Sequence, residues 1–301
     1  MKKNFLEFLT MSLRKKRKAI FLFGMFILVI SVTIFTACNV SSNLSPYSKG
    51  VLTVTFIDVG QGDSIFLAMD DETMLIDTGE KEYAYKVTQF IQEKDYDRIG
   101  VLVATHPHDD HIGGMAEIIR NFTIGKMYMP DVSHTTQTFI NMMDAIENKN
   151  VSRHIPLQGE NFKLGKATVT VLSAGLSNYS LNNTSIVLKV ELDKYAFIFT
   201  GDVEFEAERD ILSAKARFDI SAYVLKISHH GSDTSTSDDF LDAVKPKIAV
   251  ITVGKDNRYE HPDKEVIDKL SKKGIKTYLT SKKRNITIVT DGRKMEVITT
   301  K

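Results

Sequence analysis

The residues with the clearest chemical potential lie in the stretch THPHDDH, residues 105–111. Three of the chain's eight histidines alternate here with acidic residues, giving His106, His108, Asp110 and His111. Imidazole and carboxylate groups together suit zinc, manganese or iron. Four such side chains lie within six positions. Because alternate residues point in opposite directions, we expect His106 and His108 to bind one ion, and Asp110 and His111 a second.

The flanking residues predict how this stretch is held. An apolar run at residues 99–104 (IGVLVA) predicts a buried strand. Two glycines follow the stretch, and residues 115–121 then have helical spacing. The four candidate ligands therefore lie on a tight loop at the carboxyl end of a strand, which is where open α/β sheets place their sites.

Three later loops carry similar residues after apolar runs. Residues 195–200 (YAFIFT) end just before Asp202, which either caps the helix predicted at 204–212 or bridges two metal ions. The remaining candidates also follow predicted strands: His229 and His230 after residues 222–227, and His261 in the loop 254–262 after residues 247–253. This recurrence predicts one metal centre assembled from several strand ends.

Polar residues near residue 60 are candidates to orient the ligands. Strands are predicted at residues 51–57, 64–69 and 74–77, and the acids and amide at their ends or turns are Asp58, Gln61, Asp63 and Asp77. Such groups either cap turns or accept the free N–H of a ligand imidazole. His134 and His154 lie in predicted loops and are weaker candidates for contact with metal or substrate.

Composition predicts a globular α/β protein. The chain has 301 residues, of which 43% are hydrophobic and 26% charged, with a formal net charge of +1. Residues 1–50 hold eight of the 39 Lys and Arg residues and one of the 38 acids, so the remainder has a formal charge of −6. That charge is not typical of a general polyanion binder. The exception is residues 269–294, where nine Lys and Arg accompany one acid, either as a solvated surface or as an edge that holds a polyanion.

The first 38 residues resemble a membrane-targeting segment. A basic cluster at residues 14–18 precedes nineteen uncharged, mostly apolar residues at 19–37. The chain's only cysteine, Cys38, follows directly, as in a bacterial lipoprotein signal, and its position excludes a catalytic cysteine in the domain. The alternative is an uncleaved signal anchor; either way the basic flank stays inside and the domain lies outside. We expect a linker at residues 39–50 and one domain at 51–301.

The motifs of that domain resemble the metallo-β-lactamase superfamily, in particular its branch represented by the extracellular hydrolase domain of the competence DNA-uptake protein ComEC. The motifs that carry the resemblance are DVGQGDS (58–64), LIDTG (75–79), THPHDDHIGG (105–114), NNTSIVL (182–188), FTGD (199–202), KISHHGS (226–232) and His261-Pro262. The resemblance implies an αββα sandwich and a metal-dependent hydrolase with two divalent ions, Zn or Mn. It places the first metal motif on residues 106–111, the bridging carboxylate on Asp202 and the last histidine on His261 or the 229–230 pair.

One departure from the superfamily pattern affects the metal sites. Typical members have another ligand histidine between His111 and Asp202, whereas residues 172–185 here contain none. Asn183, His230 or water would then complete the first site, and manganese becomes plausible because oxygen-rich sites favour harder ions.

The resulting functional hypothesis is a membrane-tethered phosphodiesterase or nuclease, with catalytic roles for Asp110, Asp202 and His230. Its substrate would be DNA or another phosphodiester. The alternatives are a hydrolase of lactam, lactone or thioester carbonyls and a non-catalytic surface lipoprotein.

Overall fold

Two mixed β-sheets form the centre of the folded unit that begins at Leu44. The computed structural model describes residues 44–175 and 180–300. The first sheet has the order β15-β14-β1-β2-β3-β4-β5-β6, and the second has the order β13-β12-β11-β10-β9-β8-β7. The strands of the first sheet are β1 (Leu52–Phe56), β2 (Ile65–Met69), β3 (Glu72–Ile76), β4 (Arg98–Val103), β5 (Thr123–Tyr128), β6 (Arg153–His154), β14 (Ile286–Thr290) and β15 (Met295–Thr299). Those of the second are β7 (Asn161–Leu164), β8 (Ala167–Ala174), β9 (Ile186–Leu192), β10 (Tyr195–Phe199), β11 (Val224–Lys226), β12 (Ile248–Ile251) and β13 (Lys276–Leu279).

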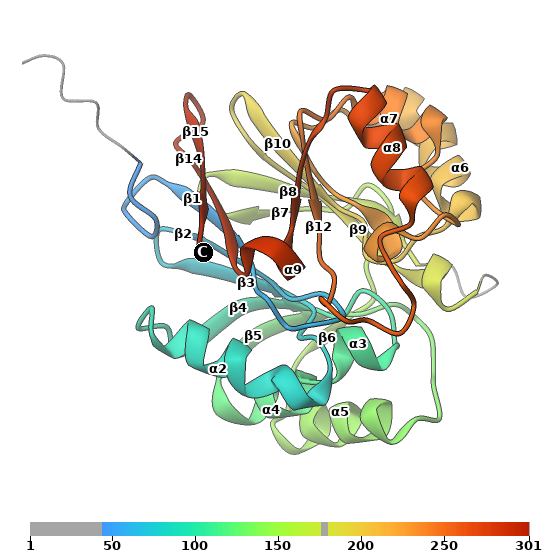
Figure 1. Ribbon diagram of the computed structural model, residues 1–301. Coiled ribbons are helices and arrows are strands. Elements are labelled where there is room, and N and C mark those ends of the chain that lie inside the picture. The colour runs from blue at the N-terminus through green and yellow to red at the C-terminus, as the bar shows by residue number, and fades with distance from the viewer. Residues whose placement is uncertain (1–43, 176–179, 301) are drawn as a thin grey trace, which may run out of the picture. The chain divides into compact units, whose positions relative to one another are not determined.

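Helices cover the outer face of each sheet (Figure 1). On the first sheet lie α2 (Ala84–Gln92), α4 (Met115–Asn121) and α5 (Gln137–Asn148); on the second lie α6 (Phe205–Ser213), α7 (Asp238–Val244) and α8 (Lys264–Lys272). The short helices are α3 (Asp109–Ile112) and α9 (Thr280–Lys283), and the 3₁₀ turns are η1 (Lys81–Tyr83), η2 (Asn182–Thr184), η3 (Ala214–Ala216) and η4 (Ser228–Gly231). The predicted αββα arrangement is therefore confirmed.

Period-two patterns of apolar residues build the core between the sheets. In β1, Leu52, Val54 and Phe56 are fully buried against residues of the second sheet. The rings of Phe56 and Phe199 lie 6.1 Å apart across this layer. Truncating one such buried aromatic side chain to alanine costs about 3–5 kcal/mol in proteins. This layer therefore contributes strongly to holding the two sheets together.

The covering helices bury one apolar stripe each. In α5, Phe139, Met142 and Ile146 recur at intervals of three and four and are buried in the outer core of the first sheet. The helix begins where the hydroxyl of Thr136 accepts the backbone N–H of Phe139. The second sheet has its own outer core beneath α6, α7 and α8.

Parallel strands bring the functional loops to one edge of each sheet. Strands β3, β4 and β5 run parallel in the first sheet, and β10, β11, β12 and β13 run parallel in the second. The loops that carry the candidate residues follow β4, β10, β11 and β12, so their common location follows from the direction of these strands.

The compact unit includes the described residues that precede β1. Residues 44–50, predicted as linker, pack against β1: the backbone N–H of Tyr47 donates to Oγ1 of Thr53 at 2.9 Å, and its hydroxyl lies 3.0 Å from Oγ1 of Thr55. The predicted targeting segment, including Cys38, lies outside the described residues. Within the described part of the chain, no helix is long and apolar enough to cross a membrane.

Candidate metal centre

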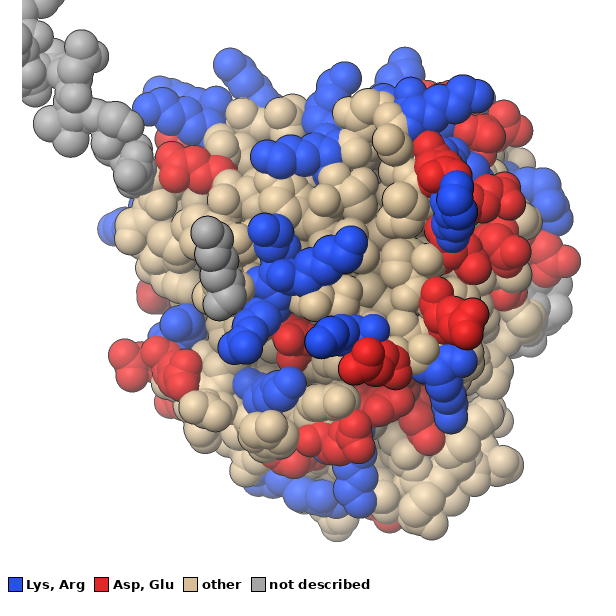
Figure 2. All heavy atoms as spheres, viewed as in Figure 1, with Lys and Arg blue, Asp and Glu red and all other residues tan. Residues whose placement is uncertain are grey.

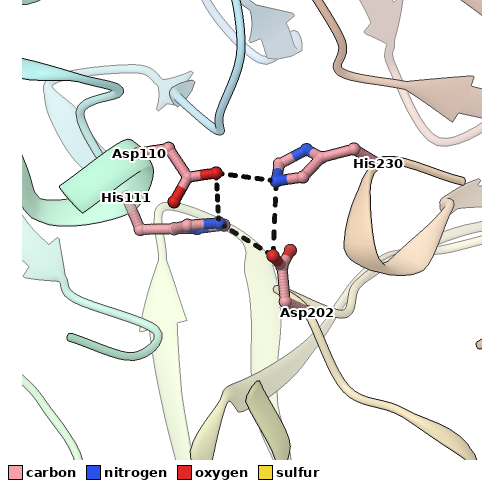
Figure 3. Close-up of side chains that lie close together, drawn as sticks. All are labelled: Asp110, His111, Asp202 and His230. Carbon is pink, nitrogen blue, oxygen red and sulfur yellow. Dashed lines mark ion pairs between the residues drawn. The ribbon is translucent and has the colours of Figure 1, made fainter. Parts of the chain in front are cut away.

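Four side chains from three loops form a closed ring at the sheet edge (Figure 3). Asp110 and His111 lie on α3, Asp202 follows β10, and His230 lies in η4 after β11. Oδ2 of Asp202 is 3.2 Å from Nε2 of His111 and 3.3 Å from Nε2 of His230. Oδ2 of Asp110 is 3.3 Å from the same His230 nitrogen and 3.9 Å from Nε2 of His111. One nitrogen or oxygen of each side chain therefore points at a common centre.

An unusual backbone turn selects His230 for this ring. His229 and His230 both have left-handed backbone angles, with φ values of 48° and 54°. Such angles are uncommon for residues other than glycine, and the surrounding structure has to hold them in place. Nδ1 of His230 lies 2.8 Å from the carbonyl oxygen of Thr252, to which it donates, so Nε2 is directed at the ring.

The ring fits a divalent cation. Among the described residues, Nε2 of His111, Nε2 of His230 and Oδ1 of Asp202 are buried without a hydrogen bond of good geometry. Unsatisfied buried polar atoms are costly, and a metal ion would satisfy the two nitrogens together with the neighbouring carboxylates. Two imidazoles and two carboxylates are ligands suited to zinc, manganese or iron.

His106 and His108 form a second, smaller group next to the ring. Nε2 of His106 lies 3.0 Å from Nδ1 of His108 and 4.0 Å from Oδ2 of Asp202. The other ring nitrogen of His106 lies 3.1 Å from Oγ1 of Thr105 and 3.3 Å from Oγ of Ser185, which fixes the imidazole plane. Two imidazole nitrogens and the shared Asp202 carboxylate could hold another ion, with fewer protein ligands than the ring offers.

Asp77 orients His111 from behind. Its Oδ2 lies 2.8 Å from Nδ1 of His111 and accepts the Thr105 hydroxyl at 2.6 Å, while Oδ1 accepts the Thr105 backbone N–H at 2.8 Å. A carboxylate on Nδ1 leaves Nε2 free to bind metal and raises its basicity. This is the orienting position that the sequence predicted for Asp77.

Asp63 also reaches the centre, together with a lysine that the sequence analysis did not identify. Lys226, at the end of β11, is fully buried, and its Nζ lies 2.6 Å from Oδ2 of Asp63 and 3.5 Å from Oδ1 of Asp202. It also donates to the carbonyl oxygen of Gly201 at 2.8 Å. Oδ1 of Asp63 accepts the hydroxyl of Thr252. In the sequence, Lys226 stands out as the single basic residue in the apolar run of a predicted strand.

The buried charges shift the pKa values strongly. Burial would lower the pKa of His111, but Asp202, Asp110 and Asp77 outweigh it and raise that pKa well above its usual range. Burial is outweighed in the same way at His230, where Asp202 and Asp110 raise the pKa to about 10. The charges of His111 and His230 overcome the burial of Asp202 and hold its pKa well below its ordinary value. Burial lowers the pKa of His106 and of His108, so these two rings are neutral at pH 7.

A cavity of about 400 Å³ opens over the ring. Its wall includes His229 and His261, whose rings are 5.8 Å apart and which do not join the four-residue group. The ring of Tyr259 stacks on His261 at 5.8 Å, and the guanidinium of Arg258 lies 4.8 Å from the Tyr259 ring. His229 and His261, which the sequence proposed as metal ligands, therefore line the space where a substrate would lie, and so does His134.

Three predicted candidates do not contact the ring. The side chain of Asn183 accepts the backbone N–H of Glu204 at 2.7 Å and donates to Glu204 and Glu206, so it holds the start of α6. Asp58 accepts the N–H of Gly60 in its own turn. His154 pairs with Glu160 at 2.7 Å. Gln61 lies between these cases, because it lines the cavity while its Oε1 accepts the N–H of Gly254 at 3.3 Å.

The fold and the ring of ligands define a class of metal-binding α/β sandwich proteins. The chain belongs to the metallo-beta-lactamase superfamily, whose family model matches residues 57–255. It is 29% identical to ComE operon protein 3 of Bacillus subtilis over 77% of this chain and 32% of that protein. It is 28% identical to competence protein ComA of Neisseria gonorrhoeae over 75% of this chain and 30% of that protein. The predicted resemblance to competence proteins is confirmed.

The chain spans about a third of the length of these relatives. Among solved structures, the metallo-beta-lactamase fold protein YhfI of Bacillus subtilis is similar, with a TM-score of 0.53 and 13% identity over 76% of this chain and 95% of that one. At that identity the likeness concerns the fold alone. The superfamily fold implies divalent metal binding, which agrees with the candidate His/Asp ring.

Proposed function

We propose that the protein is a metal-dependent phosphodiesterase. The observation that carries the proposal is the ring of Asp110, His111, Asp202 and His230, whose facing atoms converge beneath an open cavity. A cation at this position would meet any substrate that enters the cavity. The resemblance of the motifs to a competence DNA-uptake protein favours a phosphodiester substrate, and two relatives named for competence support that resemblance.

Two divalent ions, Zn or Mn, are the proposed cofactors. The first would be held by the ring, and the second by Nε2 of His106 and Nδ1 of His108 together with Asp202. Ions bound there would lower the pKa of water toward neutrality and would offset the negative charge of the phosphoryl oxygens. Because the second group has fewer ligands, we expect it to bind its ion more weakly than the ring does.

The chain's own residues would align the substrate and manage protons. Asp202 reaches both groups, so its carboxylate fixes the distance between them. Asp110, partly exposed to the cavity, is placed to orient the attacking water by accepting a hydrogen bond from it. On the cavity wall, Arg258 offers a planar set of N–H donors to phosphate oxygens, and His229 and His261 are placed to contact the leaving group.

A panel of substrates tests this proposal. The purified protein is incubated with Mn²⁺ or Zn²⁺ and with bis(p-nitrophenyl) phosphate, single-stranded DNA, a β-lactam or a thioester. We expect turnover of the diester and of DNA, with chelator-treated protein as the inactive control. Turnover of the lactam or thioester without cleavage of either phosphodiester would establish a carbonyl hydrolase instead. No turnover of any substrate by metal-loaded protein would favour a non-catalytic protein.

A further inference from the structure

A buried lysine lies between the metal ring and the loop that precedes β2. Lys226 is 0% exposed, and its ammonium group contacts Asp63 at 2.6 Å, the carbonyl oxygen of Gly201 at 2.8 Å and Asp202 at 3.5 Å. An unpaired ammonium group is very costly to bury, so these three oxygens are what allow Lys226 to remain there. Lys226 thereby joins the second sheet to a loop of the first.

The acids behind the ring are served by protein donors. Asp63, Asp77 and His111 lie close enough together to hold a metal ion. However, Asp77 already accepts two hydrogen bonds from Thr105 and lies 2.8 Å from Nδ1 of His111. Asp63 accepts the hydroxyl of Thr252 and pairs with Lys226. The cation that compensates the charge of Asp63 behind the ring is therefore the ammonium group of Lys226.

We propose that Lys226 is an internal cation of the metal centre, which compensates the buried carboxylates of Asp63 and Asp202 when no metal is bound. With Oδ1 of Asp202 next to Lys226, Oδ2 is turned toward His111 and His230. The inference rests on the metal-binding part of the proposed function and is independent of the substrate.

The proposal predicts an energetic coupling between Lys226 and the bound ion, because both cations act on Asp202. Without metal, Lys226 is the only lysine in contact with Asp63 or Asp202 among the described residues. Its loss then leaves two buried carboxylates poorly compensated. A divalent ion held by the ring would replace the two imidazole protons and would act directly on the carboxylate of Asp202. The removal of Lys226 should therefore destabilise the metal-free protein more than the metal-bound protein.

The experiment measures the melting temperature of the purified full chain in EDTA and in Mn²⁺, for wild type and for Lys226→Met. Breaking a buried ion pair predicts a decrease of roughly 10 °C in EDTA. In Mn²⁺ we expect less than half of that decrease. The matched control is Lys189→Met, because Lys189 on β9 is also buried, at 1% exposure, but pairs with Asp219 and Glu191. The decrease in melting temperature caused by Lys189→Met should be equal in EDTA and in Mn²⁺.

A second variant covers the case in which Lys226→Met does not fold. The double variant Lys226→Met, Asp63→Asn removes both charges of the closest pair, and it should fold and melt above the single variant in EDTA. Equal decreases for Lys226→Met in EDTA and Mn²⁺, or a double variant no more stable than the single one, would overturn the internal-cation assignment. If Mn²⁺ fails to stabilise wild type, the proposed metal site is wrong. The comparison of the single and double variants in EDTA then still tests the role of Lys226.

Discussion

At the scale of single residues, the carboxylate of Asp202 determines the chemistry of the ring. It lies within 3.3 Å of two imidazole nitrogens and close to the ammonium of Lys226. Without metal, these neighbours keep Asp202 ionised and keep His111 and His230 protonated. The protons on the two imidazoles occupy the positions that a divalent ion would take. Metal binding must therefore displace protons from this ring.

This displacement can be measured as proton release. The pKa of His230 is raised to about 10 and that of His111 is also raised, so both rings carry a proton at pH 7 in the metal-free protein. Because a ligand imidazole must be neutral, binding of Mn²⁺ at pH 7 should release about two protons, and affinity should increase with pH up to the raised pKa values. Isothermal titration calorimetry in two buffers with different ionisation enthalpies measures the number. A binding enthalpy that is the same in both buffers would contradict this protonation state.

The sequence alone could identify some of these residues and not others. The alternation of His106, His108, Asp110 and His111 after a strand predicted a metal loop, and that loop does lie at the sheet edge. The sequence could not predict which member of the 229–230 pair faces the ring, because the left-handed backbone angles of both residues decide this. Nor could it predict that Asn183 turns toward Glu204, since that contact depends on where α6 begins relative to η2.

At the scale of elements, the loop between β1 and β2 holds α3 in place. The backbone N–H of Asp63 donates to the carbonyl oxygen of Asp110 at 3.1 Å. Gly62, with φ of +113°, lies so close that an added Cβ would be 2.0 Å from that same carbonyl oxygen. A glycine at this position is therefore required by space as well as by its backbone angle.

Replacing this glycine should disturb the metal ring. We expect Gly62→Ala to push α3 away, to destabilise the fold by about 1–3 kcal/mol and to weaken Mn²⁺ binding about tenfold or more. The control is Gly274→Ala, because Gly274 also has a left-handed φ, +68°, but no heavy atom within 4 Å of an added Cβ. Chemical denaturation and metal titration of both variants give the comparison. Equal metal affinity in the two variants would show that contact with Asp110 is unimportant.

The basic segment 269–294 contains several elements. It includes the end of α8, then β13, α9 and β14, and β14 pairs antiparallel with β1. The sequence could not place β14 beside β1, because these two strands are more than 200 residues apart in the chain. Figure 2 shows Lys and Arg side chains gathered over the face that carries α9, with acidic side chains beside them. Just after α9, Oδ1 of Asn285 accepts the N–H of Asp58 at 2.8 Å.

This location gives a test for a polyanionic substrate. Charge reversal at Lys282, Lys283 and Arg284 to glutamate should slow cleavage of single-stranded DNA much more than cleavage of bis(p-nitrophenyl) phosphate, because only the polymer is long enough to reach α9. The salt dependence of DNA cleavage should decrease in the same variant. Equal effects on both substrates would show that the basic segment does not contribute to binding of the polymer.

At the scale of the whole molecule, the match to the competence-related relatives takes in about three quarters of this chain and about a third of each relative. The resemblance therefore concerns a part of those proteins. The segment before Leu44 lies outside the described residues, and its role as a lipid-attached or uncleaved anchor is a prediction from the basic cluster, the apolar run and Cys38.

Lipid attachment can be tested in cells. If Cys38 is lipidated, a Cys38→Ser variant should lose incorporation of a labelled fatty acid and should keep its amino-terminal segment. Protease treatment of intact cells should degrade the domain of the wild-type protein, because the basic flank predicts an outward orientation. An unlabelled wild-type protein that retains its first 37 residues would instead indicate a signal anchor, and protection from protease would contradict the outward orientation.

The central claim is that the ring binds the ion that drives phosphodiester hydrolysis. The most direct measurement is metal content together with bis(p-nitrophenyl) phosphate turnover for wild type and for Asp202→Ala and His230→Ala. His154→Ala serves as the control, because His154 pairs with Glu160 away from the ring. We predict that the control keeps metal and activity, whereas the two site variants stay folded, lose bound metal and lose more than the roughly 100-fold that removal of an orienting partner costs. Full metal content and full turnover in both site variants would contradict the account.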